Sequence, residues 1–473
     1  MRSITFCVSF LLSTLLLHLC LYYEVASGDQ IIGSDRKALE ITTGGYGGGY
    51  YPASPPPPEH CPPPPPPPPK PICTTLHRPH SSSSLTTAVL LPLRYPELML
   101  SHTHHLQSTH CVPGCEVAAV AHQLQVFRTW TGYSWKGLFC DAHPDFNQQA
   151  LAAVDFNGFK LGRKDGGSLP LYGFIDELPD ITVFHANSNN FTGSVPKKVM
   201  TLKYFFELDL SNNKLSGQFP MEVLGATQLT FLDLRFNSLC GTVPPGVFNL
   251  DVDVIFINNN NFVQKLPDNL GSTPALYLTF ANNKFTGQIP RSIGTGNTSE
   301  NLIEVLFLNN HLSGCLPPEI GRLKRATVFD VSINWLTGPI PQSFQCLTKI
   351  ALLNLAQNQF YGAIPEAICK LPDLSKFTLS YNYITEVGPE CRKLIGKGIL
   401  DVRMNCIIDL PNQRSKEECA KFFEKNEYHT CPNEKMYSHH IPCKNKHYSG
   451  SDHQPTVAAT SPLSYDALTP HKL

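Results

Sequence analysis

The sequence predicts an α/β repeat fold, a solenoid in which about ten right-handed coils of similar sequence stack side by side. Three observations predict it: a motif that recurs at a nearly constant period, an apolar pattern typical of one short strand per coil, and cysteines that flank the repeats. The repeats occupy residues 150–399, which is enough sequence for a continuous hydrophobic core.

An asparagine recurs at intervals of 23, 24 or 27 residues in the frame apolar-x-apolar-x-x-Asn-x-apolar, as in Leu208–Leu215. The two apolar positions are typical of a short strand with one buried face. The amide that follows can bond the backbone of neighbouring coils, so we expect a ladder that satisfies buried polar groups. The predicted ladder residues are Asn189, Asn213, Asn237, Asn260, Asn283, Asn310, Asn334, Asn358 and Asn382.

A proline recurs in the second half of every unit, and in seven of the nine units a glycine precedes it by three residues. Gln264 and Glu386 replace this glycine in the other two units. Glycine permits the turn, and proline ends strand pairing. The form Leu-x-Gly-x-Ile-Pro resembles the plant-specific class of leucine-rich repeats, which implies a second short strand and a twisted superhelix. The prolines are Pro196, Pro220, Pro244, Pro267, Pro290, Pro317, Pro341, Pro365 and Pro389.

Residues 1–27 have the pattern of a secretory signal peptide, with Arg2, an apolar stretch from Ile4 to Leu21 and a small-residue exit at 25–27. A membrane anchor is the alternative, but the stretch is short for a span. No later segment is long and apolar enough to cross a bilayer. We therefore expect a secreted, extracellular protein without a membrane span.

The composition of residues 28–110 predicts a disordered linker. A Gly/Tyr-rich stretch is followed by proline runs at 55–58 and 62–69, which favour extended polyproline. One serine followed by four prolines resembles the extensin repeat, so attachment to a cell wall is the alternative to a plain spacer. Histidines between His102 and His110 lie near Cys111 and Cys115. They have no framework that would fix ligand geometry, so we expect no metal site and no cofactor.

The cysteines indicate caps stapled by disulfides in an oxidising compartment. A solenoid exposes apolar core at both ends, so we expect caps at 111–149 and 400–443, followed by a disordered tail at 444–473. The pairings that we expect are Cys391–Cys406 and Cys419–Cys431. Four single cysteines within the repeats are expected to be free: Cys240, Cys315, Cys346 and Cys369.

The formal net charge is −1, and charged residues make up 16% of the chain. A nucleic-acid-binding protein would need a basic stripe, so the composition argues against that class. A solenoid turn also offers no closed, water-excluding pocket for acid–base chemistry, and no nucleophile motif is present. We expect a binding protein and no enzyme.

Residues between the two apolar strand positions should face the concave surface. This column contains several acids, and a negative patch would attract a cationic peptide. The alternative is that these aspartates bond neighbouring repeats. Candidate ligand-binding residues are His185, Glu207, Asp209, Asp233, Phe256, Asp330 and Asn354. Two sequons predict N-glycosylation at Asn190 and Asn297.

In addition to the shared repeat length, successive segments are similar in detail to repeats of the plant leucine-rich repeat extensin family. The segments are residues 184–193, 207–213, 231–237, 314–321, 327–332, 404–407 and 413–415. The resemblance implies a secreted cell-wall protein that binds small, basic, cysteine-rich signalling peptides, the rapid alkalinization factors, in wall integrity and growth control. It also implies a homodimer.

Two departures from this family stand out. No serine–proline extensin region follows the repeats, so the chain resembles an extensin-less branch. The cysteine expected between Gly132 and Trp135 is missing, which leaves Cys115 or Cys111 as the partner of Cys140 and raises the question of a misassembled gene model over residues 75–126. The alternative function is that of a polygalacturonase-inhibitor-like or pectin-binding defence protein, with cell-wall polysaccharide as its partner.

Overall fold

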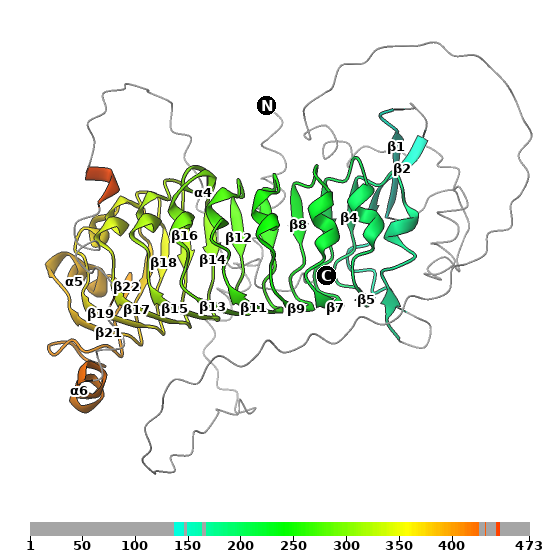
Figure 1. Ribbon diagram of the computed structural model, residues 1–473. Helices are drawn as coiled ribbons and strands as arrows, with labels where there is room; N and C mark the ends of the chain where they lie inside the picture. Colours follow the sequence, from blue (N-terminus) through cyan, green and yellow to red (C-terminus); the bar gives the residue numbers. More distant parts are fainter. Residues whose placement is uncertain (1–136, 146–148, 163–166, 425–430, 432–440, 445–473) are drawn as a thin grey trace, which may run out of the picture. The chain divides into compact units, whose positions relative to one another are not determined.

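The computed structural model describes residues 137–145, 149–162, 167–424, 431 and 441–444. The predicted signal and linker lie outside these residues, as do most of the amino-terminal cap and tail, Cys115 and the side chain of Cys140. The described coils stack into a regular array that has two sheets and a side of short helical turns (Figure 1). The predicted repeat fold is therefore confirmed.

The first sheet takes one short strand from each coil. Its strands are parallel and in register, apart from the antiparallel pair β1 and β2 at its amino-terminal end. The strands in spatial order are β1 (Leu138–Ala142), β2 (Gln149–Asp155), β4 (Val183–His185), β6 (Glu207–Asp209), β8 (Phe231–Asp233), β10 (Val254–Phe256), β12 (Tyr277–Thr279), β14 (Glu304–Leu306), β16 (Val328–Asp330), β18 (Leu352–Asn354), β20 (Lys376–Thr378) and β22 (Leu400–Asp401).

The second sheet begins just after the ladder asparagine of each coil and is also parallel. Its strands are β3 (Leu169–Pro170), β5 (Phe191–Gly193), β7 (Lys214–Gln218), β9 (Ser238–Gly241), β11 (Asn261–Lys265), β13 (Lys284–Gly287), β15 (His311–Cys315), β17 (Trp335–Pro339), β19 (Gln359–Ala363) and β21 (Tyr383–Glu386). The glycine of the repeat has φ between +73° and +93° in seven coils, and Gln264 takes the same left-handed conformation at +90°.

The third side of most coils is a short 3-10 turn rather than an α-helix, because few residues separate the proline from the next strand. The carbonyl of the recurring proline accepts the first bond of the turn, as Pro317 does from Ile320 at 3.1 Å. The turns of the coils are η1 (Ile175–Glu177), η2 (Lys197–Thr201), η3 (Met221–Gly225), η4 (Pro245–Asn249), η5 (Leu270–Ser272), η6 (Arg291–Gly294), η7 (Pro318–Arg322), η8 (Gln342–Cys346) and η9 (Ile368–Lys370). A further 3-10 turn, η11 (Pro442–Lys444), lies beyond the repeats and packs against η7 and η8. The α-helices among the described residues are α4 (Asn297–Asn301), α5 (Pro389–Gly396) and α6 (Lys416–Glu424).

The core between these three sides is built from buried apolar side chains of every coil. Phenylalanines of successive coils contact each other along it. The ring of Phe280 lies 5.5 Å from that of Phe307 and 6.0 Å from that of Phe248. Each fully buried phenylalanine contributes about 1.5–3 kcal/mol through burial, so the stack supplies much of the free energy of folding.

The nine predicted asparagines all make ladder bonds at the seam between the two sheets. Asn283 is typical: its amide donates to the carbonyls of Ile257, Phe280 and Ala281, and its oxygen accepts from Phe262 N–H at 3.0 Å. Asn405 makes the same set of bonds one coil further on. It is a tenth member of the ladder that the sequence reasoning missed, although it stands 23 residues after Asn382.

The ladder ends at Gln413, which does not belong to a repeat. Its Oε1 accepts from the N–H of Ile407 at 3.3 Å, and its Nε2 donates to Val402 O at 3.1 Å. In the preceding coil, Asn405 makes the equivalent bonds to Ile384 N–H and Leu379 O. The Gln413 amide, which belongs to the cap, thus takes the place of the asparagine that a further coil would provide.

The disulfides correct our predicted pairings. The structure pairs Cys315 with Cys431, Cys346 with Cys443, Cys369 with Cys391 and Cys406 with Cys419. The pairings Cys391–Cys406 and Cys419–Cys431 are therefore wrong, and so is the expectation that Cys240, Cys315, Cys346 and Cys369 are free, since Cys240 is also disulfide-bonded. The physical reason is that Cys431 and Cys443 lie beside coils far back in the sequence, so their partners precede them by 116 and 97 residues.

Candidate functional site

The face of the first sheet that points away from the core, called here the first-sheet face, is formed by three rows of side chains. Because side chains alternate along a strand, the outer rows lie two residues before and two residues after the middle row in each coil. The middle row follows the strand register from Asp155 in β2 to Asp401 in β22. In order, it consists of Asp155, His185, Asp209, Asp233, Phe256, Thr279, Leu306, Asp330, Asn354, Thr378 and Asp401. All the residues of the predicted binding column lie on this face.

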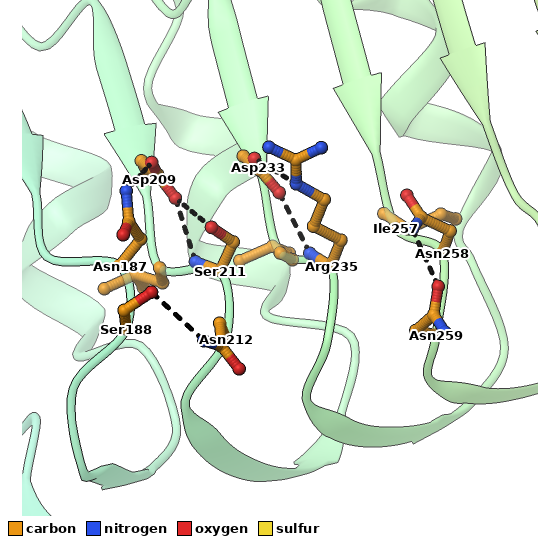
Figure 2. A network of polar contacts seen from close by, with 12 residues as sticks. Asn187, Ser188, Asp209, Ser211, Asn212, Asp233, Arg235, Ile257, Asn258 and Asn259 are labelled. Carbon is orange, nitrogen blue, oxygen red and sulfur yellow. Dashed lines mark hydrogen bonds and ion pairs between the residues drawn. The ribbon is translucent and has the colours of Figure 1, made fainter. Parts of the chain in front are cut away.

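At the amino-terminal end of the first-sheet face, Asp209 is held by its neighbours (Figure 2). Its Oδ1 accepts from the N–H and the hydroxyl of Ser211, at 2.9 and 2.7 Å, and its Oδ2 accepts from the amide of Asn187 at 3.0 Å. Its side chain is 5% exposed. The carboxylate therefore braces two coils and has little surface to offer a ligand.

Asp233 is fully buried and forms an ion pair with Arg235, whose Nε lies 2.9 Å from Oδ2. Burial, together with the charge of Asp209, raises the pKa of Asp233 well above its usual value, and Arg235 offsets only part of this rise. The Arg235 guanidinium in turn lies 5.0 Å from the centre of the Phe256 ring. This pair adds little net negative charge to the first-sheet face.

His185 and Glu207 form a second, more accessible pair, with Nε2 and Oε2 2.9 Å apart. Burial lowers the pKa of His185, but the hydrogen bond and charge of Glu207, with the charges of Asp209 and Asp155, outweigh burial, so the pKa is raised above its usual value. Protonated His185 is thus stabilised beside three carboxylates.

The centre of the first-sheet face is apolar. Phe231 and Phe256 are partly exposed, and their rings lie 6.4 Å apart in an edge-to-face arrangement. Further along, Ala281, Leu306 and Val328 form a small cluster, separate from the main core, against which Leu308 and Leu352 pack. Ala281, Leu306 and Val328 are buried, whereas Leu308 and Leu352 are partly exposed, like the two phenylalanines. An exposed apolar patch with a polar rim is typical of a protein-binding surface.

A hollow of about 830 Å³ lies at the carboxyl-terminal end of this face. Its lining includes Asp330, Asn354, Lys376, Asp401 and Arg403. Asp330 is fully buried, and its carboxylate accepts from Ser332 and from the amide of Asn354 at 2.9 Å. Arg403 binds Asp401 in bidentate fashion, at 2.9 and 2.8 Å, and this hydrogen bonding holds the pKa of Asp401 below its usual value.

The predicted site residues therefore divide into two groups. Asp209, Asp233 and Asp330 are buried and bonded to neighbours, as in the alternative interpretation of the sequence, whereas His185, Glu207, Phe256 and Asn354 are partly exposed. The reasoning missed Lys376, Asp401 and Arg403, although counting the frame one coil beyond Thr378 finds the last two.

The two sequons differ in their surroundings. Asn297 stands exposed at the start of α4, and its amide donates to Ser272 O at 2.7 Å. Asn190 is partly buried, and its amide donates to Gly167 O at 3.0 Å. Glycosylation of both stays a prediction. In the part of the chain that the structure describes, no three His, Cys, Asp or Glu side chains gather in a possible metal site, and no helix has the length and apolarity of a membrane span.

Comparison with known proteins first identifies the class of repeat. The Leucine Rich Repeat family model matches residues 206–225 and 228–250. Several leucine-rich repeat extensin-like proteins of Arabidopsis thaliana are homologues of the chain, which confirms the resemblance. Protein 2 is 43% identical over 43% of this chain and 26% of its own length, protein 6 is 37% identical over 56% and 54%, and protein 4 is 47% identical over 35% and 33%. The chain thus spans about half or less of the length of these curated relatives.

Among solved structures, the array is similar to the Arabidopsis receptor kinase HAESA in complex with the peptide hormone IDA and the co-receptor SERK1. The TM-score is 0.50 at 26% identity, over 61% of this chain and 47% of that one. A TDR receptor matches with a TM-score of 0.46 at 32% identity, over 49% of this chain and 40% of that one.

Proposed function

We propose that this protein is a secreted leucine-rich repeat binding protein of the plant cell wall and apoplast, without catalytic activity. Its first-sheet face would bind a small, basic, cysteine-rich signalling peptide of the rapid alkalinization factor type, in the control of wall integrity and growth. The homology to extensin-like proteins and the likeness to a receptor structure with a bound peptide hormone support this proposal. The disulfides are consistent with an oxidising, extracellular location.

The observation that carries the proposal is the order of charged, apolar and hollow regions along the first-sheet face. At the amino-terminal end, the carboxylates of Asp155, Glu207 and Asp209 outnumber the protonated His185, and this end leads to an apolar centre and then to the hollow beyond it. The three rows contain three cations, Arg235, Lys376 and Arg403. They contain seven carboxylates, of which the last four are buried: Asp155, Glu207, Asp401, Glu304, Asp209, Asp233 and Asp330. A basic peptide would be attracted by this excess of negative charge and would bury its apolar residues against Phe231 and Phe256.

Titration calorimetry with a folded synthetic peptide of the rapid alkalinization factor type tests the proposal. We expect Phe256→Ala to weaken binding by about tenfold or more, since aromatic side chains at the centre of an interface dominate its energy. Trp335→Ala removes an exposed aromatic from the second sheet and serves as the control, with unchanged affinity. If the wild-type protein does not bind, or if both variants bind as tightly as wild type, the assignment fails.

A further inference from the structure

The face of the second sheet that points away from the core, called here the second-sheet face, has a composition opposite to that of the first. Among the described strands, those from β3 to β19 contain no aspartate or glutamate. They contribute the cations Lys214, Lys265 and Lys284. A partner attracted to this face would therefore be negatively charged.

The lysines of β11 and β13 lie beside an exposed aromatic pair. In the strand register, Lys265 is opposite Thr286, and Thr286 is opposite His311. The ring of His311 stacks on that of Trp335, with centroids 4.8 Å apart and planes 6° apart. Lys265, Lys284, Thr286, His311 and Trp335 are called here the second-sheet patch.

The side chains of Lys265, His311 and Trp335 are exposed, so this patch faces solvent. Trp335 is 56% exposed, which is unusual for so large an apolar side chain. The stem of Lys265 lies flat over the next coil, because a Cβ added at Gly287 would meet Lys265 Cγ at 2.8 Å and Cδ at 3.2 Å. Lys265 has no ion pair with any carboxylate in the described residues. Its ammonium group is available to an external anion.

We propose that the second-sheet patch binds a linear acidic polysaccharide, a polymer of uronic acids. A pyranose ring has an apolar C–H face that stacks on a flat aromatic surface such as the Trp335–His311 pair. A uronic acid also carries a carboxylate on the same ring, which pairs with a lysine. An acidic peptide offers the charge without the adjoining apolar ring. This assignment gives the protein a second partner on a surface separate from the proposed peptide site.

Binding to polygalacturonate, measured by affinity electrophoresis in the presence of EDTA, tests this proposal. We expect Lys265→Glu to weaken binding by about tenfold, which is the effect of replacing an attraction by a repulsion between partly screened charges. Trp335→Ala should weaken it by a similar factor. Lys198→Glu makes the same charge change on the exposed surface of η2 and should leave binding within about twofold of wild type.

Two comparison polymers decide the chemistry. Fully methyl-esterified polygalacturonate keeps the rings and loses the charge, so we expect its binding to be weaker by about tenfold or more. Polyglutamate keeps the charge and lacks the rings, and equal binding of polyglutamate and polygalacturonate would overturn the sugar assignment. Lack of any effect from Lys265→Glu and Trp335→Ala would overturn the site. Peptide binding by these variants is a separate readout, because Phe256 lies on the other sheet.

Discussion

The first-sheet face and the second-sheet face belong to the same coils but differ in how their charged side chains are held. On the first, Asp209, Asp233 and Asp330 are at most 5% exposed, and each is bonded to side chains or backbone of its own or a neighbouring coil. On the second, Lys265 lies over Gly287 without an ion pair in the described residues. A repeated acid in a solenoid can therefore be part of the scaffold, while a less regular lysine forms the available surface.

The largest expected effect concerns the seam that joins the two faces. Asn283→Ala removes one acceptor and three donated bonds at a side chain that is 7% exposed. Because it leaves buried backbone groups without partners, we expect a loss of about 3 kcal/mol in the free energy of unfolding. Chemical denaturation measures this loss. Asn261→Ala, at the exposed start of β11, is the control and should change stability by less than about 0.5 kcal/mol.

The next effect tests whether the acids of the first-sheet face are structural. Asp330→Ala leaves Ser332 and Asn354 without their acceptor in a fully buried position. We expect a loss of about 2 kcal/mol in the free energy of unfolding, within the range for unsatisfied buried polar groups. A loss below about 0.5 kcal/mol in denaturant titration would show that this carboxylate is not part of the scaffold.

A smaller effect depends on pH. The pKa of His185 is raised in the folded protein, so the His185–Glu207 pair contributes its full stabilisation below pH about 6.5, the pKa of unfolded histidine. That contribution is lost as the pH rises through the folded pKa, and we expect it to be on the order of 1 kcal/mol. His185→Gln should remove this part of the pH dependence of thermal stability. A variant with the same profile as wild type would contradict the assignment.

The smallest expected effect is on the second-sheet face. Lys265→Ala should change the free energy of unfolding by no more than about 0.5 kcal/mol, because the side chain is exposed and has no ion pair in the described residues. Measuring the stability of Lys265→Ala beside that of Asp330→Ala compares the two faces most directly. Equal losses for both variants would show that the two faces do not differ in the way proposed.

The repeat period, the asparagine ladder and the prolines could be predicted because each depends on local sequence that recurs in every coil. The disulfides could not, since Cys315 and Cys431 are 116 residues apart and the repeat does not encode the path that brings them together. The burial of Asp209 was also hidden, because it depends on Asn187 and Ser211 closing over the carboxylate. Which face carries exposed, unpaired charged side chains could not be predicted either, because it depends on how the three sides of each coil pack together.

Gln413 has a consequence for how such proteins change in length. Its amide bonds the last coil at Ile407 N–H and Val402 O. The ladder asparagines make the same two kinds of bond at the earlier junctions, as Asn405 does. The Gln413 junction therefore fits a generic coil and not a particular one. Removing or duplicating one complete unit before Cys315 should leave both the Gln413 junction and the late disulfides intact, so evolution can lengthen or shorten the molecule in whole modules without redesigning its end.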